Sequence, residues 1–234
     1  MVPSLLFPLL FLALTSSAFD RSTALPGFPQ VESFLQFVVA TTIVQGALFG
    51  SIAAGSDMAT DIEDGFFDRL IASPVARTSI LVGRVMGSMV FGFMQAWLFF
   101  GITSLFGLNV RSELIGMAAI SLVSALLAGG IGAVSVAFAL RTGSAEAVRG
   151  AFPLLFSFLF LSSAFFPRDL MNGWFKSVAS LNPLSYMIEG LRSQVITGLD
   201  AGGLATAAGV ALGILVVGTS AAGLALRRRL TANF

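Results

Sequence analysis

The stretch LIGMAAISLVSALLAGGIGAVSVAFAL, residues Leu114–Leu140, contains no charged residue. A helix needs about 20 consecutive apolar residues to cross the hydrocarbon core of a bilayer, and a charge at its centre costs about 2.5–3.5 kcal/mol. Five further uncharged stretches are close to this length or exceed it: Met1–Phe19, Ser33–Ser56, Val85–Val110, Gly150–Pro167 and Ala201–Leu226. The pattern predicts an all-α, polytopic membrane protein with six transmembrane helices in a lipid bilayer.

The composition excludes several classes of function. Of the 234 residues, 56% are hydrophobic, and a net charge of +1 is too small for a nucleic-acid groove. The chain has no Cys and no His, so the commonest general base and metal ligands are missing. The only Lys, Lys176, does not follow a phosphate-binding loop. We therefore expect no catalytic residue, no metal site and no cofactor in this chain.

The start of the chain allows two interpretations. Met1–Phe19 resembles a secretory signal peptide in length, but no Lys or Arg precedes its apolar run. We favour a retained first membrane helix. With six spans both termini lie on one side, and Arg227–Arg229 directly after the last span places that side at the anionic inner leaflet. We expect a multi-pass protein of the bacterial plasma membrane with cytoplasmic termini.

The most charged part of the chain is residues 57–84, between the second and third apolar stretches. The spacing of Ile62, Phe66 and Leu70 predicts one apolar face of a short amphipathic helix that ends before Pro74. Such a helix either lies on lipid headgroups or docks onto a cytosolic protein. Its aspartates favour the second alternative, because an inner leaflet is anionic. Phe66, Phe67 and Leu70 are then the expected apolar anchors.

Residues 168–200 contain apolar segments that are too short to span a bilayer and that are separated by Asn182-Pro183. We expect a re-entrant helical hairpin there, with its backbone buried in protein. Glu189 and Arg192 are three residues apart, and this spacing is compatible with an ion pair on one helix face or with an exposed, weak pair. Trp174 and Tyr186 are expected as anchors at the membrane interface.

Two blocks of residues resemble the type-two class of ABC transporter permeases. The first is EDGFFDRL at residues 63–70, followed by Ser73-Pro74, Arg77 and Gly83-Arg84. The second is LSSAFFP at 161–167, followed by NPLSY at 182–186 and EGLR at 189–192. The resemblance covers essentially the whole chain and is nearest to the daunorubicin-resistance branch of drug exporters. The chain departs from the family pattern by beginning almost inside its first helix and by having Asn172 where Pro is usual.

The resemblance implies one permease domain over residues 1–234, with a cytoplasmic coupling loop at 57–84 and an extracellular re-entrant segment at 168–200. It implies two permease chains, as a homodimer or as a heterodimer with a related permease, bound to ATP-binding cassette ATPase subunits. The residues that match the coupling loop are Glu63, Asp64, Gly65, Phe66, Phe67, Leu70, Pro74 and Arg77. Those that match the extracellular gate are Asn182, Pro183, Tyr186, Glu189 and Arg192.

Phenylalanine is abundant, with 23 residues against one Tyr, and it crowds the fifth apolar stretch. Most of these rings are expected to face lipid, but the family places the second and fifth helices along the substrate path. Polar groups inside spans need hydrogen-bond partners. The expected lining of the path is therefore Gln45, Phe49, Phe152 and Phe156.

The sequence as a whole predicts a permease subunit that exports a hydrophobic or amphiphilic compound, such as a drug, a lipid or a glycan, with ATP hydrolysed by a separate subunit. A secondary transporter would need ionisable residues deep in the spans, and the sequence places none at mid-span. An intramembrane enzyme is disfavoured by the missing His and Cys. A structural membrane protein without an ATPase partner would not need an acidic docking helix.

Overall fold

Long helices dominate the protein. The computed structural model describes residues 2–74 and 76–232, without the side chains of residues 2–4, 152 and 232. Within these residues five helices are long and apolar enough to cross a membrane. They are α1 (Val2–Phe19), α2 (Phe34–Glu63), α4 (Arg77–Ser104), α5 (Glu113–Thr142) and α10 (Ala201–Ala232). The shorter helices are α3 (Phe66–Ala72), α6 (Ala145–Gly150), α7 (Phe152–Phe160), α8 (Gly173–Leu181) and α9 (Pro183–Ile196), with 3-10 turns η1 (Asp20–Ala24) and η2 (Arg168–Leu170).

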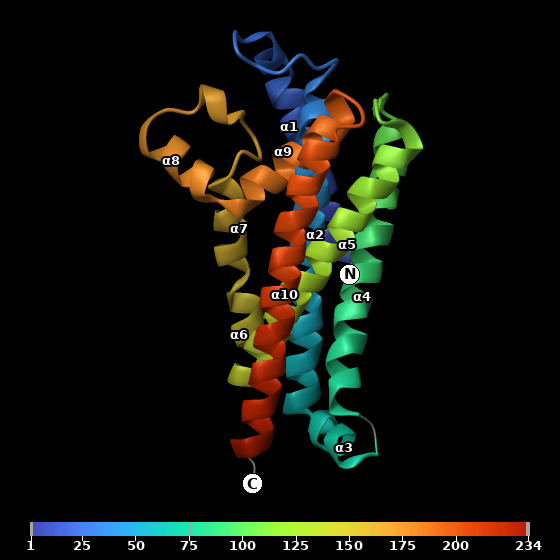
Figure 1. Cartoon of the computed structure of the whole chain (residues 1–234), viewed down its shortest axis with the longest axis vertical. Helices are drawn as coiled ribbons and strands as arrows, with labels where there is room; N and C mark the ends of the chain where they lie inside the picture. The colour runs from blue at the N-terminus through green and yellow to red at the C-terminus, as the bar shows by residue number, and fades with distance from the viewer. Residues whose placement is uncertain (1, 75, 233–234) are drawn as a thin grey trace.

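The long helices form one bundle whose two ends differ (Figure 1). Helices α2, α4, α5 and α10 run side by side along the longest axis, and α5 packs against the other three. Helix α3 lies at the same end as the C-terminus, which we call the α3 end. Helix α8 and the α1–α2 connection lie at the opposite end, which we call the α8 end.

Small residues allow the central helices to approach closely. A Cβ atom on Gly218 of α10 would lie 2.4 Å from the carbonyl oxygen of Gly130 in α5. The hydroxyl of Ser124 in α5 donates a hydrogen bond of 3.0 Å to the carbonyl oxygen of Gly92 in α4. In lipid, where no hydrophobic force drives helices together, close backbone packing and interhelical hydrogen bonds are what hold a bundle together.

The expectation of six continuous spans is not confirmed. The stretch Gly150–Pro167 forms no single long helix: α6 ends at Gly150, α7 covers only Phe152–Phe160, and turns follow. Pro153 lies in the first turn of α7 and has no N–H with which to continue the hydrogen-bond ladder of α6. Nine residues at about 1.5 Å each make α7 roughly 14 Å long, too short to span alone. Figure 1 shows α6 and α7 following one another along one side of the bundle.

The expected amphipathic helix around residues 57–70 is also corrected. Helix α2 continues to Glu63, and Gly65 then adopts a left-handed conformation with φ of +67°. Ile62 and Phe66 therefore lie on different helices and share no continuous face. Helix α4 begins at Arg77, eight residues before the uncharged stretch that starts at Val85. Arg84 of α4 forms an ion pair with Asp61 of α2, so the two helix ends are joined through their charges.

The predicted helix break at Asn182-Pro183 is present. Helix α8 ends at Leu181 and α9 begins at Pro183. Asn182 is the N-cap of α9, because its side-chain oxygen accepts a 2.9 Å hydrogen bond from the backbone N–H of Leu184. Pro183 occupies the first helical position, where its missing N–H costs nothing. Insertion of this hairpin into the bilayer stays a prediction.

Candidate functional site

The phenylalanine pair of the expected coupling loop is split between surface and core. Phe66 is 47% exposed, whereas Phe67 is only 1% exposed. Phe67 belongs to a buried cluster with Met58 of α2, Leu140 of α5 and Leu226 of α10. Of the three expected anchors, Phe67 is therefore not available to a partner, and Leu70 is half-buried. Phe67 instead fastens α3 to the bundle.

Charged side chains connect α3 and its neighbours to the rest of the α3 end. An oxygen of Glu63 accepts a 2.8 Å hydrogen bond from the backbone N–H of Ala145, at the start of α6. A carboxylate is favourable at a helix N-terminus. Arg229 donates a 3.0 Å hydrogen bond to the carbonyl oxygen of Leu140, and its guanidinium carbon lies 5.8 Å from the ring centre of Phe67. The contact of Glu63 thus links the end of α2 to the helix pair α6–α7.

The other residues of the expected coupling loop lie on the surface of the α3 end. Gly65, which supplies the left-handed turn, is half-buried. Exposed charged side chains of both signs follow and precede Phe66 in the sequence, namely Asp64, Asp68, Arg69 and Arg77. Pro74 is also exposed. A partner that binds here meets one large exposed ring within a charged surface.

A column of phenylalanine rings runs between α1, α2 and α7. Phe49 of α2 lies 5.7 Å from Phe156 of α7, measured between ring centres, and Phe156 lies 4.6 Å from Phe160. Phe160 lies 4.8 Å from Phe165 in the turn after α7. Phe7 of α1 covers the column from the other side, at 5.8 Å from Phe49 and 6.1 Å from Phe156. Two residues expected to line a substrate path, Phe49 and Phe156, are thus in contact.

The other two expected path residues do not join this column in the described structure. Gln45 is 1% exposed, and neither polar atom of its amide has a hydrogen-bond partner in the described residues. The side chain of Phe152 lies outside the described residues. Gln95 of α4 donates a long hydrogen bond of 3.5 Å to the carbonyl oxygen of Ile43. Both glutamines predicted inside the spans are therefore buried, and within the described residues the Gln45 amide and the Gln95 side-chain oxygen have no hydrogen-bond partner.

The column connects two cavities. Towards the α3 end, Phe49 lines a cavity of about 430 Å³ together with Ser56, Asp57 and Arg149. Arg149 donates a 2.9 Å hydrogen bond to the hydroxyl of Ser56. Towards the α8 end, Phe160 and Phe165 line a second, almost wholly apolar cavity of about 520 Å³. We call it the phenylalanine cavity; its lining residues are Phe11, Thr15, Phe19, Phe34, Phe160, Ser162, Phe165, Phe166, Met171 and Phe175.

At the α8 end, α9 holds the turn that follows α7. The Asn182 side-chain nitrogen donates to the carbonyl oxygens of Phe158 and Leu161, at 2.7 and 3.1 Å. The backbone N–H of Ser163 donates a 3.0 Å hydrogen bond to the hydroxyl of Ser185. A helix that ends inside a bundle leaves carbonyl groups without partners. Asn182 supplies donors for two of these carbonyl groups from the neighbouring helix, and Ser185 supplies an acceptor for the N–H of Ser163.

Arg192 completes this connection. It is only 4% exposed, and its nitrogens donate to the carbonyl oxygens of Phe37, Ser163 and Ala164 at 3.0, 3.0 and 2.8 Å. Its Nη2 also lies 3.3 Å from the hydroxyl oxygen of Thr41, and its guanidinium carbon is 3.6 Å from the ring centre of Phe37. One cation thus joins α2, α9 and the turn after α7, and no carboxylate of the described residues pairs with it.

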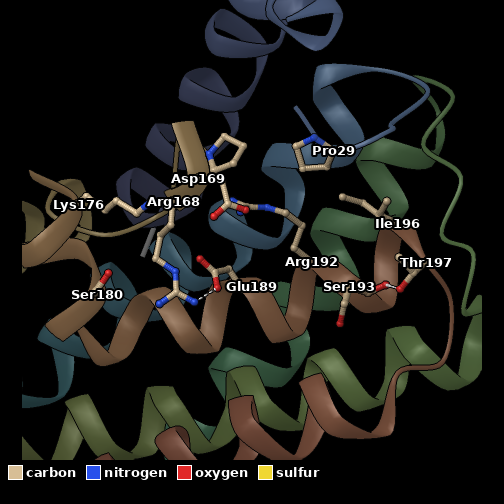
Figure 2. A pocket seen from close by; sticks show the side chains of 11 residues that line it. Pro29, Arg168, Asp169, Lys176, Ser180, Glu189, Arg192, Ser193, Ile196 and Thr197 are labelled. Atoms are coloured by element: carbon tan, nitrogen blue, oxygen red, sulfur yellow. Dashed lines mark hydrogen bonds and ion pairs between the residues drawn. The ribbon is translucent and has the colours of Figure 1, made fainter. Parts of the chain in front are cut away.

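The predicted alternative of a Glu189–Arg192 ion pair is wrong. Glu189 pairs with Arg168 of η2, and Figure 2 shows this contact with Arg192 further along the same helix α9. Arg168 also lies over the ring of Tyr186, with 4.4 Å between its guanidinium carbon and the ring centre. The hydroxyl of Tyr186 donates to the carbonyl oxygen of Ser180 at 2.8 Å. Of the expected gate residues, Glu189 and Tyr186 thus contact Arg168, whereas Arg192 contacts α2 and the turn after α7.

Arg168 and Glu189 line a polar cavity of about 420 Å³ at the α8 end (Figure 2). Lys176 of α8 and Asp169 of η2 also line it. The segment from Phe165 to Met171 separates this cavity from the phenylalanine cavity. Its apolar residues Phe165, Phe166 and Met171 line the apolar side, while Pro167, Arg168 and Asp169 line the polar side.

Sequence reasoning missed several of these contacts. Arg168 follows Pro167 of the second block but was not expected at the gate, and Arg149 was not expected at any site. The available signal for Arg168 was a charge directly after an apolar stretch. No sequence signal connects Glu63 to the start of α6, 82 residues away.

The fold and these clusters define a class of protein: a polytopic helical membrane protein with the short helix α3 at one end and, at the other, a broken helix held by α8 and α9. The chain matches the ABC-2 type transporter family over residues 1–196. It belongs to this family of transporter permeases, which confirms the resemblance seen in its motifs.

Several curated proteins are similar to this chain. The daunorubicin resistance ABC transporter permease protein DrrB1 of Streptomyces coeruleorubidus is 25% identical over 185 residues, covering 78% of this chain. The putative transport permease ycf38 is 31% identical over 202 residues in Pyropia yezoensis and 30% identical over 209 residues in Cyanophora paradoxa, covering 79% and 82% of this chain. The alignments span 62%, 64% and 66% of these three relatives, so the chain matches somewhat less than two thirds of their length.

Proposed function

We propose that this chain is the permease subunit of an ABC exporter in the plasma membrane, which moves a hydrophobic or amphiphilic compound with ATP hydrolysed by a separate subunit. Two copies, or one copy and a related permease, form the membrane part with two ATPase subunits. The chain itself holds neither a nucleotide nor another cofactor. Family membership and the drug-resistance relative support this assignment. The structural observation that carries it is that Phe67 anchors α3 in the buried cluster, while Glu63 at the end of α2 bonds to the start of α6.

The distribution of charge supports a cytoplasmic position for the α3 end. Arg141, Arg149 and Arg227–Arg229 belong to the ends of helices that meet there, and α4 begins there with Arg77. Arginine and lysine are enriched on the cytoplasmic side of membrane proteins. The C-terminus then lies in the cytoplasm, and the polar cavity of the α8 end opens to the outside.

In this orientation α3 is the docking element. Phe66 is its large exposed ring and serves as the apolar anchor for an ATPase subunit, while the surrounding charges set the partner's orientation. A force on α3 reaches α2 through the Gly65 turn and reaches α6 and α7 through Glu63. These are the helices that bear Phe49 and Phe156.

The proposed substrate route follows the phenylalanine column. The cavity towards the α3 end combines apolar Phe49 with the polar groups of Ser56, Asp57 and Arg149, and an amphiphile has matching apolar and polar parts. The rings then provide an apolar surface without directional bonds up to the α8 end. Arg192, Asn182 and the Arg168–Glu189 pair hold the segment that closes this end.

Docking is tested with Phe66→Ala, with Leu181→Ala as the control. Leu181 is 84% exposed and lies at the opposite end of the bundle. The full chain is co-expressed with a candidate ATPase subunit, and both co-purification and ATP-dependent transport into inside-out vesicles are measured. We expect Phe66→Ala to lose most of the bound ATPase and Leu181→Ala to retain it. Equal retention by the two variants contradicts the proposed docking.

Force transmission is tested separately with Glu63→Ala. We expect the ATPase to stay bound and to hydrolyse ATP, while transport falls, because α6 is no longer connected to the end of α2. Glu32→Ala is the matched control, since Glu32 lies in the α1–α2 connection and its pair with Arg111 is exposed and long, at 3.9 Å. Unchanged transport in Glu63→Ala would rule out this path of transmission.

A further inference from the structure

We propose that the phenylalanine cavity binds one acyl chain of an anionic phospholipid from the leaflet at the α8 end. This site goes beyond the export function and requires neither ATP nor a transported compound. It is built from three parts of the chain that are far apart in sequence: α1, the beginning of α2 and the segment from the end of α7 to α8.

The interior of the cavity offers no free hydrogen-bonding group. Its two hydroxyls are both satisfied by their own helices or turns: Thr15 donates to the carbonyl oxygen of Phe11 at 2.7 Å, and Ser162 donates to that of Leu159 at 2.5 Å. The remaining lining side chains are phenylalanines and a methionine. A hydrocarbon chain loses no hydrogen bond on entering such a space, whereas a polar headgroup would.

The cavity is accessible from the surrounding lipid. Phe19 at the end of α1 and Phe160 at the end of α7 both line the cavity and are partly exposed, at 40% and 38%. Trp174, next to the lining residue Phe175, is 71% exposed. Tryptophan is typical of the membrane interface, so we place the opening just below the level of the headgroups.

Two basic residues lie within two sequence positions of residues that line the cavity. Arg21 follows Phe19 by two residues, and Lys176 follows Phe175 directly. Both are exposed, and neither forms an ion pair with any described residue. Lys176 lines the neighbouring polar cavity, so its ammonium lies on the polar side of α8 while Phe175 faces the apolar side. A phosphate headgroup beside the cavity complements these two cations, which have no ion-pair partner in the described part of the chain.

The test measures the lipid retained by the full chain. The chain is reconstituted in nanodiscs of phosphatidylglycerol and phosphatidylcholine in equal amounts, transferred to detergent and analysed by native mass spectrometry. Thr15→Trp fills the cavity, and Leu14→Trp is its control, because Leu14 is 69% exposed on the adjacent position of α1. We expect one retained phosphatidylglycerol per chain, a reduction of at least fivefold in Thr15→Trp and no change in Leu14→Trp.

A second pair of variants keeps the proposal testable where Thr15→Trp fails to fold. Met171→Trp fills the cavity from the other wall, and Asn172→Trp, at an exposed position, is its control. The double variant Arg21→Gln, Lys176→Gln is expected to retain phosphatidylcholine as readily as phosphatidylglycerol. Equal lipid retention by the filling and control variants overturns the site. Retention of a non-lipid compound or of a free fatty acid in preference to phosphatidylglycerol also overturns it.

Discussion

Replacing Arg192 by Met removes the cation that joins α2, α9 and the turn after α7. Arg192 donates to three carbonyl oxygens and the hydroxyl of Thr41. Thr41 also donates to the carbonyl oxygen of Ala164 at 2.7 Å, so that oxygen keeps one partner. The carbonyl oxygen of Ser163 loses its contact with Arg192, and a buried acceptor left unsatisfied costs about 1–3 kcal/mol.

Folding also removes water from the guanidinium of Arg192, and this unfavourable desolvation is absent with Met. It therefore offsets part of the stability lost with the hydrogen bonds. Adding the lost contacts to Phe37 and Thr41, at about 1 kcal/mol net for each hydrogen bond, we expect Arg192→Met to lower the free energy of unfolding by about 2–4 kcal/mol. Arg192→Lys should not restore it, because an ammonium cannot reproduce the planar fork that reaches several oxygens at once.

The assay is reversible unfolding in mixed micelles with increasing SDS, followed by tryptophan fluorescence. Arg168→Met is the control, since Arg168 is only partly buried and a pair of this kind contributes about 0–1 kcal/mol. A loss below about 1 kcal/mol in Arg192→Met, or full recovery in Arg192→Lys, would refute the reasoning that several directed hydrogen bonds hold this end together.

Three further predictions concern single contacts. Asn182→Ala removes the α9 cap and the hydrogen-bond donor to two carbonyl oxygens. In the same SDS titration it should lower the free energy of unfolding by about 1–3 kcal/mol, whereas the control Asn172→Ala should change it by about zero. Gly218→Leu should separate α10 from α5 and lower the free energy of unfolding by about 1–3 kcal/mol or more. Gly223→Leu should leave the free energy of unfolding unchanged, because Gly223 has open space around it. The N–H of Gly203 and the Ser193 side chain lower the pKa of the Asp200 carboxyl. Its stabilising contribution is therefore present above the ordinary pKa of 3.8 and is lost as the pH falls below it. We expect the hydrogen-exchange rate at the start of α10, divided by the rate in Asp200→Asn at the same pH, to rise on acidification.

Much of the architecture could be predicted from the sequence because lipid imposes strict rules. The uncharged stretches around residues 33–56, 114–140 and 201–226 became α2, α5 and α10, since a bilayer admits long apolar helices and few charges. The same rules are weaker at helix ends. A charged residue can extend a helix into water, and α2 and α4 do so through the Asp61–Arg84 pair, which joins residues far apart in sequence.

The candidate site shows the same division. The sequence predicted the break at Asn182-Pro183, because it depends on the conformational preferences of adjacent residues. It did not predict the turn at Gly65, since the spacing of Ile62, Phe66 and Leu70 favoured one continuous helix there. Only the tertiary structure decided that Phe67 is buried while Phe66 is exposed, and that Glu189 selects Arg168 and leaves Arg192 to backbone carbonyls. These outcomes depend on which distant helices pack together, and no spacing within one helix contains that information.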